Sequence, residues 1–388
     1  MIFYAIYVLY ISMENSLKKL EILAEDAQYD LACACGNGKQ FDSSRKRGED
    51  GRWLYPVTVA SGGHGLLLKT LQSNCCSNDC KYCPLRNNAN ARRCSLSPAE
   101  TARIFMDYHR RRPEIFGMFL SSGIVRDPDF TMQRLLDTAA ILRQYYRFKG
   151  YIHLKVIPGA SDAAVEEALR LATAVSLNIE APGEKYFRKL SDAKQFERDI
   201  VHPLKLIGNL TARGSKYAKV KASTQFIVGA AGERDSEIVN YVDAIYTRLK
   251  FERVYFSAYQ PGLGDSSIPG EQDFHLTPEA RFTREHRLYQ CDFLLRTYGF
   301  KKDELVFERD GNLSLGSDPK EVWAQNHPEF FPVNINKADK LELMRIPAIG
   351  AETAVKIIRL RAIHRLSSLM EVGVKGKQLQ KAGPYACA

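Results

Sequence analysis

The chain has 388 residues, of which 45% are hydrophobic and 26% are charged. This composition excludes an extensively disordered protein and predicts a folded, water-soluble one, built as one large domain with appendages or as two domains. The formal net charge of +10 suggests a polyanionic partner, although charge bears on association and not on fold.

The N-terminal segment, residues 1–55, is expected to be an extension of the main domain. Its first part, from Met1 to Ile11, is strongly apolar, but about 11 residues cannot span a bilayer, and neither a basic n-region nor a cleavage site accompanies them. We therefore expect no signal peptide, no membrane segment and a cytoplasmic location. The polar residues after Met13 are typical of a natural start, so the first 12 residues could be a start-codon artefact.

A parallel sheet is indicated by six short apolar runs that alternate with longer helical patterns. The expected strands are Leu66–Leu71, Gly117–Ser121, Tyr151–Val156, Ala174–Ile179, Ser223–Val228 and Arg253–Ser257. The expected helices are Pro98–Arg111, Thr131–Tyr146, Ala163–Ala172, Ser191–Leu210, Asp235–Leu249 and Pro278–Tyr298. This α/β pattern predicts a partial TIM-like (β/α)6 barrel over residues 56–330, with an open doubly wound sheet as the alternative.

The most informative motif is the spacing C-x3-C-x2-C at Cys76, Cys80 and Cys83, directly after the first expected strand. Three thiolates in one loop can ligate three irons of a [4Fe–4S] cube and leave the fourth iron without a protein ligand. S-adenosyl-L-methionine can chelate that iron through its amino and carboxylate groups. An electron from the cluster can then cleave the sulfonium to a 5′-deoxyadenosyl radical.

The other cysteines leave a zinc site open as the alternative. Cys80 and Cys83 form a CxxC pair, to which Cys94 or the pair Cys33 and Cys35 could be added. Zinc would leave the x3 spacing unexplained, and Cys75 fits no register of the motif. With no export signal, metal ligation by reduced thiols is a better interpretation than a disulfide framework.

The cysteine spacing, with Tyr82 before the third cysteine, resembles the signature of the radical S-adenosylmethionine superfamily. That resemblance implies that Cys76, Cys80 and Cys83 hold the cluster and that Tyr82 lies near the adenine of the cofactor. It also implies cofactor contacts after three later strands: a small-residue turn, a carboxylate that meets the ribose or methionyl group, and a glycine-containing motif beside the adenine. The residues at these places are Ser121, Ser122, Gly123, Glu180, Gly229 and Glu233.

His153 and Lys155 are candidate catalytic residues. They stand two positions apart on an expected strand, so their side chains share one face of the sheet. If that face is the interior of the barrel, they could act as an acid, a base or an anion contact.

The C-terminal residues 331–388 are expected to form a small all-α domain. The run Ile346-Pro347-Ala348-Ile349-Gly350 resembles the turn of a helix-hairpin-helix, and a degenerate second copy follows at residues 372–376. Such a turn offers backbone N–H groups at a helix N-terminus, where the helix dipole also favours phosphate. A small helical cap that packs on the barrel or binds protein is the alternative. The candidate DNA contacts are Ala348, Gly350, Lys356, Arg359, Lys375 and Gly376.

These features together make about 90% of the chain similar to the DNA modification/repair family of radical S-adenosylmethionine proteins. The resemblance implies action on a lesion or a base in DNA, a low-potential electron donor and, as a possible partner, a glycosylase-like DNA metabolism protein. It identifies no reaction. Action on RNA, a non-catalytic DNA-binding protein with a structural metal or Fe–S site, and a DNA glycosylase are the alternatives.

Overall fold

The computed structural model describes residues 15–27, 54–58, 64–273 and 276–388. The chain divides into two compact units, and each is described here by itself. The first holds residues up to Glu233 together with Ile245–Pro278, and the second holds Arg234–Ala244 together with Glu279–Ala388. The hairpins thus belong to a compact unit that begins well before residue 331, and the boundary at 331 stays a prediction.

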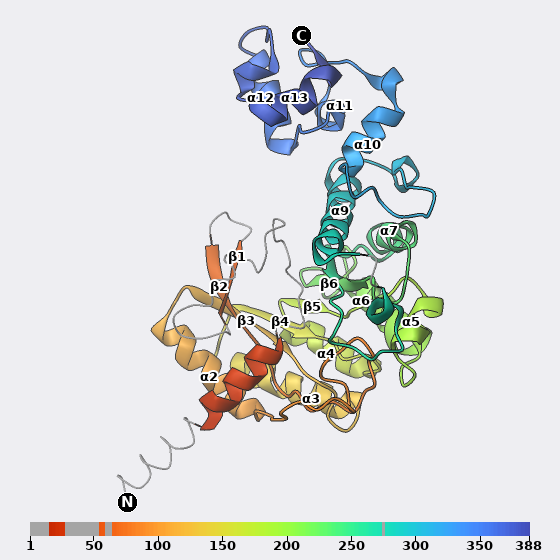
Figure 1. The fold of residues 1–388 in the computed structure, drawn as a ribbon. Helices are drawn as coiled ribbons and strands as arrows, with labels where there is room; N and C mark the ends of the chain where they lie inside the picture. The colour runs from red at the N-terminus through yellow and green to blue at the C-terminus, as the bar shows by residue number, and fades with distance from the viewer. Residues whose placement is uncertain (1–14, 28–53, 59–63, 274–275) are drawn as a thin grey trace, which may run out of the picture. The chain divides into compact units, whose positions relative to one another are not determined.

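The first unit contains a seven-stranded sheet whose strands lie in sequence order, β1-β2-β3-β4-β5-β6-β7 (Figure 1). All neighbours from β2 to β7 are parallel, and β1 is an antiparallel edge strand that was not expected. A doubly wound sheet reverses direction at a switch point, whereas this order runs one way throughout. The partial (β/α)6 barrel is therefore confirmed. The strands are β1 (Leu54–Thr58), β2 (His64–Leu71), β3 (Ile115–Ser121), β4 (Tyr151–Lys155), β5 (Ala174–Ser176), β6 (Lys221–Val228) and β7 (Arg253–Ala258).

Helices connect the successive parallel strands from β2 to β7, and α2, α3, α4 and α6 pack one beside the next (Figure 1). A further helix covers residues 15–26. The segments η2, η3 and η4 are π-helical. The elements are α2 (Pro98–Arg111), α3 (Pro128–Ala140), η2 (Ile141–Tyr145), α4 (Asp162–Leu171), α5 (Glu184–Leu190), η3 (Phe196–Val201), α6 (His202–Thr211), η4 (Ile245–Leu249) and α8 (Pro269–Gln272).

The helix expected over Ser191–Leu210 is wrong in its first part. Residues 191–195 are irregular, and the helix begins only at Phe196. The reason is a contact with a distant loop: the Ser191 hydroxyl and the N–H groups of Asp192 and Ala193 all donate to the carboxylate of Asp79. Donors turned toward Asp79 favour an irregular path over a continuous helix.

The fifth strand is shorter than expected, because β5 ends at Ser176 and not at Ile179. Beyond it the hydroxyl of Thr224 interrupts the backbone pairing, because it accepts from Ile179 N and donates to Leu177 O. Glu180 follows with a φ of 65°, a left-handed conformation that a non-glycine residue seldom adopts.

The two faces of the sheet differ in polarity. One face carries fully buried apolar side chains, such as Met118, Leu120 and Leu154, which form the core with the helices. The alternate positions carry polar or aromatic groups, and the strand register aligns Lys69, Phe119 and His153 in one row across three strands. Lys155 and Ser176 form part of the next row. The barrel therefore has an apolar outer layer and a polar inner face.

The second unit is mainly helical. Its elements are α7 (Asp235–Ala244), α9 (Pro278–Thr297), η5 (Lys302–Glu304), α10 (Pro319–Asn326), η6 (Pro328–Phe330), β8 (Val333–Asn334), α11 (Lys340–Arg345), α12 (Ala351–Arg361), η7 (Leu369–Val372), α13 (Gly376–Ala382), η8 (Gly383–Tyr385) and β9 (Ala386–Cys387). Strands β8 and β9 pair in parallel, so the expected all-α region contains a small sheet that joins its two ends. Its core includes Leu343, Ile349, Ile357 and Leu366, all fully buried.

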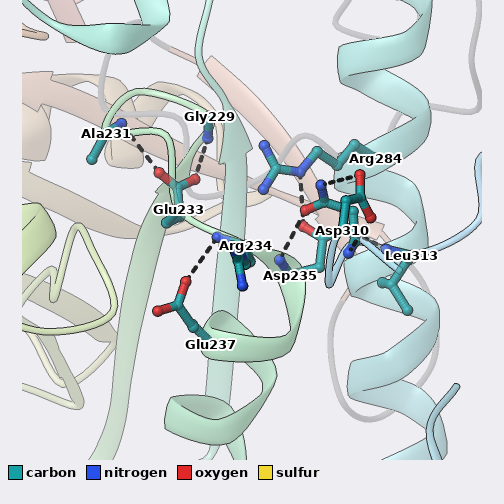
Figure 2. A network of polar contacts seen from close by, with 10 residues as sticks. Gly229, Ala231, Glu233, Arg234, Asp235, Glu237, Arg284, Asp310 and Leu313 are labelled. Carbon is teal, nitrogen blue, oxygen red and sulfur yellow. Dashed lines mark hydrogen bonds and ion pairs between the residues drawn. The ribbon is translucent and has the colours of Figure 1, made fainter. Parts of the chain in front are cut away.

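A buried carboxylate explains why α7 belongs to the second unit (Figure 2). Asp235 accepts from Arg284 Nε at 2.7 Å and from Leu313 N at 2.9 Å, and its side chain is fully buried. These bonds connect α7 with α9 and with the loop before α10. In the described part of the chain, no helix is long and apolar enough to cross a membrane.

Candidate functional site

The three-cysteine motif lies in an irregular loop that follows β2, and contacts with other loops hold it in place. Asp79 binds the 191–193 segment, as described above. Lys81 N donates to Leu190 O at 2.8 Å, and Lys81 O accepts from Asp265 N at 2.6 Å. The motif is thus fixed between the segment after α5 and the segment after β7.

Two residues outside the motif, Asn74 before it and Arg93 after it, hydrogen-bond to other parts of the loop. The Arg93 guanidinium donates to four carbonyl oxygens, those of residues 74, 85, 86 and 89, at 2.6–3.1 Å. The Asn74 side chain donates to Arg92 O and accepts from Cys94 N. Because these bonds span both ends of the loop, they fix the backbone that carries the cysteines.

The three thiols lie in surroundings that suit metal-bound thiolates. Ile124 N donates to Cys76 Sγ and Leu85 N donates to Cys83 Sγ, each at 3.4 Å. Burial raises the pKa of Cys80 and of Cys83, and charge on the other motif thiols raises it further. A bound metal removes the proton that burial retains, and hydrogen bonds to sulfur are a usual feature of Fe–S sites.

The fit to a cluster differs from the fit to a single ion. Among the described residues, no three or more His, Cys, Asp or Glu side chains are grouped so that they could hold a metal ion. A [4Fe–4S] cube does not need three ligands around one ion, since each thiolate binds a separate iron. Cys94 interacts instead with Asp26 and Cys75, and burial raises its pKa to about 11. Cys33 and Cys35 lie outside the described residues.

Lys194 is a candidate site residue that sequence reasoning missed. Its side chain is buried and hydrogen-bonds Cys80. Burial opposes the charge of the ammonium, but Cys80 and Glu180 outweigh it and raise the pKa of Lys194. Lys194 follows the segment that binds Asp79, so the contact that breaks the helix also brings this cation to the thiols.

Tyr82 and Glu180 were predicted separately, and the structure brings them together. The Tyr82 hydroxyl donates to Glu180 Oε1 at 2.8 Å. Burial and the neighbouring carboxylate raise the pKa of Tyr82 well above its ordinary value. Backbone strain at Glu180 is of the kind that clusters at functional sites. Their binding of the cofactor stays a prediction.

The turn Ser121-Ser122-Gly123 lies directly against the cysteine loop. Gly123 N donates to Ser73 O at 2.7 Å. A Cβ atom on Gly123 would lie 2.5 Å from Cys75 O and 3.2 Å from Cys76 Cβ, so only glycine fits. Ser122 Oγ donates to Gly123 O at 2.7 Å, and Ser121, at the end of β3, is buried. The small residues are therefore explained by close backbone approach.

Gly229 and Glu233 form a self-contained turn after β6 (Figure 2). The Glu233 carboxylate accepts from Gly229 N and from Ala231 N, the latter at 3.1 Å. Gly229 has a φ of 91°, which glycine adopts readily. The structure thus gives Glu233 a part in shaping the turn.

His153 and Lys155 lie on the polar face of the sheet, as their spacing predicts. His153 Nε2 lies 2.8 Å from Ser176 Oγ, and its ring centroid lies 4.5 Å from that of Phe119. Lys69 extends the row, with Nζ 5.2 Å from the Phe119 ring centroid. The inner face therefore presents cations beside aromatic rings.

The C-terminal region contains two turns of the same conformation. In the first, Ala348 has a φ of 62°, Ile349 is fully buried and Gly350 is the extended N-cap of α12. In the second, Gly373 has a φ of 87°, Val374 is buried and Lys375 is the extended N-cap of α13.

The conformations of the two turns shift the alignment of the copies by one residue from that expected for residues 346–350 and 372–376. Lys375, and not Gly376, matches Gly350, because each is the N-cap of its helix. Gly350 has a φ of −99°, so the left-handed residue of the first turn is Ala348.

The basic candidates surround these turns. Lys356, Arg359 and Lys375 are all exposed. Lys356 reaches the second turn from the first helix, since its Nζ lies 3.2 Å from the place of a Cβ on Gly373. Arg361 instead donates inward to Ile335 O and Ala338 O. The structure therefore brings exposed cations of both copies to one region.

Comparisons with known proteins found likenesses among solved structures only. No protein-family model matches the chain, and no curated protein matches it. A structure of HydG, a maturase of the [FeFe]-hydrogenase, is 12% identical over 58% of this chain and 49% of its own, with a TM-score of 0.45.

Two further structures cover more of their own length. HydG from Carboxydothermus hydrogenoformans is 14% identical, with 81% of this chain and 77% of that chain covered and a TM-score of 0.47. Methylornithine synthase (PylB) is 13% identical, with 72% and 77% covered and a TM-score of 0.44.

Proposed function

We propose that this protein is a radical S-adenosylmethionine enzyme that acts on DNA. The observation that carries the proposal is the hydrogen-bonded loop with the three thiols of the C-x3-C-x2-C motif, in which N–H groups donate to two sulfurs and the buried Lys194 lies beside the third. A [4Fe–4S] cluster bound there by Cys76, Cys80 and Cys83 would bind S-adenosylmethionine at its remaining iron and supply the electron that generates a 5′-deoxyadenosyl radical.

The chain's own residues would position the reactants. Lys194 offsets the negative charge of the thiolates, and Tyr82 with Glu180 would bind the adenosine part of the cofactor beside them. The polar inner face of the sheet, with His153 and Lys155, suits a substrate that combines an aromatic base with an anionic group. Ring stacking and cation contacts are how proteins hold unstacked nucleotides.

The case for DNA rests on the second unit. Two turns of equal conformation each lead into a helix, with exposed Lys and Arg residues around them. Backbone N–H groups and cations of this kind contact phosphate without reading sequence. We therefore expect binding to duplex and single-stranded DNA that weakens with salt.

The cluster is tested by anaerobic reconstitution. The intact protein should bind about four irons per chain, and Ala at Cys76, Cys80 and Cys83 should abolish binding. Cys75→Ala is the matched control from the same loop and should retain the iron. Stoichiometric zinc without iron after anaerobic purification would contradict the proposal.

The reaction class is tested with reduced protein, S-adenosylmethionine and defined damaged or unmodified oligonucleotides, analysed by mass spectrometry. We expect 5′-deoxyadenosine, together with a mass change in one DNA substrate. Formation of S-adenosylhomocysteine without deoxyadenosine would refute the radical mechanism. If only RNA is converted, the substrate is RNA and not DNA.

A further inference from the structure

Lys320 is a buried lysine beneath the first hairpin. It lies near the start of α10, its exposed fraction is 8%, and its Nζ donates to Met344 O at 3.0 Å and to Ile349 O at 2.6 Å. Met344 belongs to the helix before the turn, and Ile349 directly precedes the N-cap of α12. One ammonium therefore bridges the two sides of the hairpin.

The charge of this group calls for a role beyond filling space. Burial lowers the pKa of Lys320 to about 8, which means that its surroundings disfavour the cation. Asp318, the N-cap of α10, offsets part of this effect by raising the pKa of Lys320, and its carboxylate also lies 3.7 Å from Lys381 Nζ. An apolar side chain of similar length would fill the volume without the cost of burying a charge.

Tyr298 completes the inner side of the turn. Lys320 Nζ lies 5.0 Å from its ring centroid. The Tyr298 hydroxyl accepts from the N–H of Ala351, and it lies 3.2 Å from the place of a Cβ on Gly350. The inner side of the turn is thus occupied by Lys320 and Tyr298.

The planarity of the peptide bond sets the direction of the next donor. In a trans peptide the C=O and the following N–H point in opposite directions. Ile349 O points at Lys320, so the N–H of Gly350 points away from it. Lys320 thereby directs the N–H of Gly350 toward the outer side of the hairpin. This N–H is the donor that the proposed function assigns to phosphate. Its positive charge also lies near the positive end of the α12 dipole.

We propose that Lys320 is an internal cation that positions the first hairpin for phosphate and strengthens its attraction for it. This inference rests on the proposed DNA binding by the second unit. Lys320 acts through the backbone of Ile349 and Gly350 and touches no DNA itself. The ligand class is the phosphodiester backbone.

The test measures binding of the full-length protein to a fluorescent duplex at fixed salt, together with its thermal unfolding. Lys320→Met should weaken binding about tenfold, the equivalent of one lost charge contact, while stability stays equal or rises because a buried charge is removed. Lys340→Met removes an exposed charge from α11 and should change binding far less. A purely structural lysine would lose stability along with affinity.

A second variant covers the case in which methionine does not fit. Lys320→Ala should lose affinity for the duplex and regain part of it on addition of methylammonium, but not of the same concentration of sodium. If Lys320→Met binds as tightly as the intact protein, or the amine restores nothing, the inference is wrong while DNA binding stands. If the intact protein binds no DNA, the proposed function itself fails.

Discussion

At the scale of single residues, the candidate metal site combines a motif readable in the sequence with partners that are not. The spacing of Cys76, Cys80 and Cys83 predicts three ligands in one loop, and in the structure hydrogen bonds from Arg93 and Asn74 hold that loop in place. Lys194 carries no sequence signal, because it stands in an unremarkable polar stretch. Its approach to Cys80 depends on the contact between Asp79 and the segment after α5, which only folding creates.

Lys194 gives a first prediction about the cluster. A buried cation beside a thiolate stabilises the reduced, more negative state of a bound cluster. Lys194→Met should therefore lower the reduction potential, by about 60 mV for each tenfold change in the one-electron equilibrium. EPR-monitored redox titration measures it. Lys185→Met, an exposed lysine of α5, is the control, and equal potentials in all three proteins would contradict the role given to Lys194.

Ala348 gives a second prediction, on stability. Its φ of 62° is a conformation that costs an L-residue about 1 kcal/mol and costs glycine little. Ala348→Gly should thus stabilise the second unit by about 0.5–1 kcal/mol, and Ala348→Val should destabilise it. Urea unfolding provides the measurement.

Ala354→Gly serves as the opposite control for the stability experiment. Ala354 is fully buried within α12, where glycine should cost about 1 kcal/mol. A loss of stability in Ala348→Gly would show that another contact of the methyl group outweighs the backbone strain.

At the scale of elements, hydrophobic periodicity predicted well where local pattern decides the structure. It placed α2 and the parallel strands within a few residues, because their apolar faces repeat with the period of a helix or strand. It failed at residues 191–195 and 177–179, where side chains from other segments take over the backbone hydrogen bonds. The edge strand β1 and the pair β8 and β9 were missed because they are short and lack alternation.

Lys320 gives an element-scale prediction about pH. Its pKa is about 8 in the folded protein and 10.5 when unperturbed, so between these values the unfolded chain binds more protons. Stability of the second unit should therefore rise as pH increases from 8 to 10.5, by up to about 3 kcal/mol. Below pH 8 the contribution of Lys320 to this stability should not change with pH.

The variant Lys320→Met isolates this pH effect from other titrating groups. The difference in unfolding free energy between the intact protein and Lys320→Met should vary across pH 8–10.5 and stay constant below it. DNA affinity should change in the opposite direction, because the intact protein loses its internal cation as pH rises. A pH-independent difference would mean that the Lys320 ammonium keeps its ordinary pKa.

At the scale of the whole molecule, composition indicated a basic protein but could not locate the division into units. The second unit takes in Arg234–Ala244, which precedes the last strand of the barrel. The cause is the bonding of Asp235 to Arg284 and Leu313, which joins segments far apart in the chain. No linker composition marks such a division, and the boundary at residue 331 stays a prediction.

The division into two units predicts that the two proposed activities can be removed one at a time. The cysteine loop lies in the first unit and both hairpins lie in the second, and each has its own hydrogen-bond network. Alanine at Cys76, Cys80 and Cys83 should abolish deoxyadenosine formation. The affinity for duplex DNA should stay within about twofold of that of the intact protein, a difference of only a few tenths of a kcal/mol in binding free energy.

The converse variant combines Lys356→Glu with Lys375→Glu, which reverses two exposed charges beside the turns. It should lower DNA affinity by about 100-fold or more at low salt, since each lost cation costs a phosphate contact and each new carboxylate repels the backbone. The dependence of the logarithm of affinity on the logarithm of salt concentration should become shallower by about two. Cleavage of S-adenosylmethionine without DNA should be unchanged. If the cysteine variant loses DNA affinity as well, the hairpins require the cluster for binding, and the two units do not act independently.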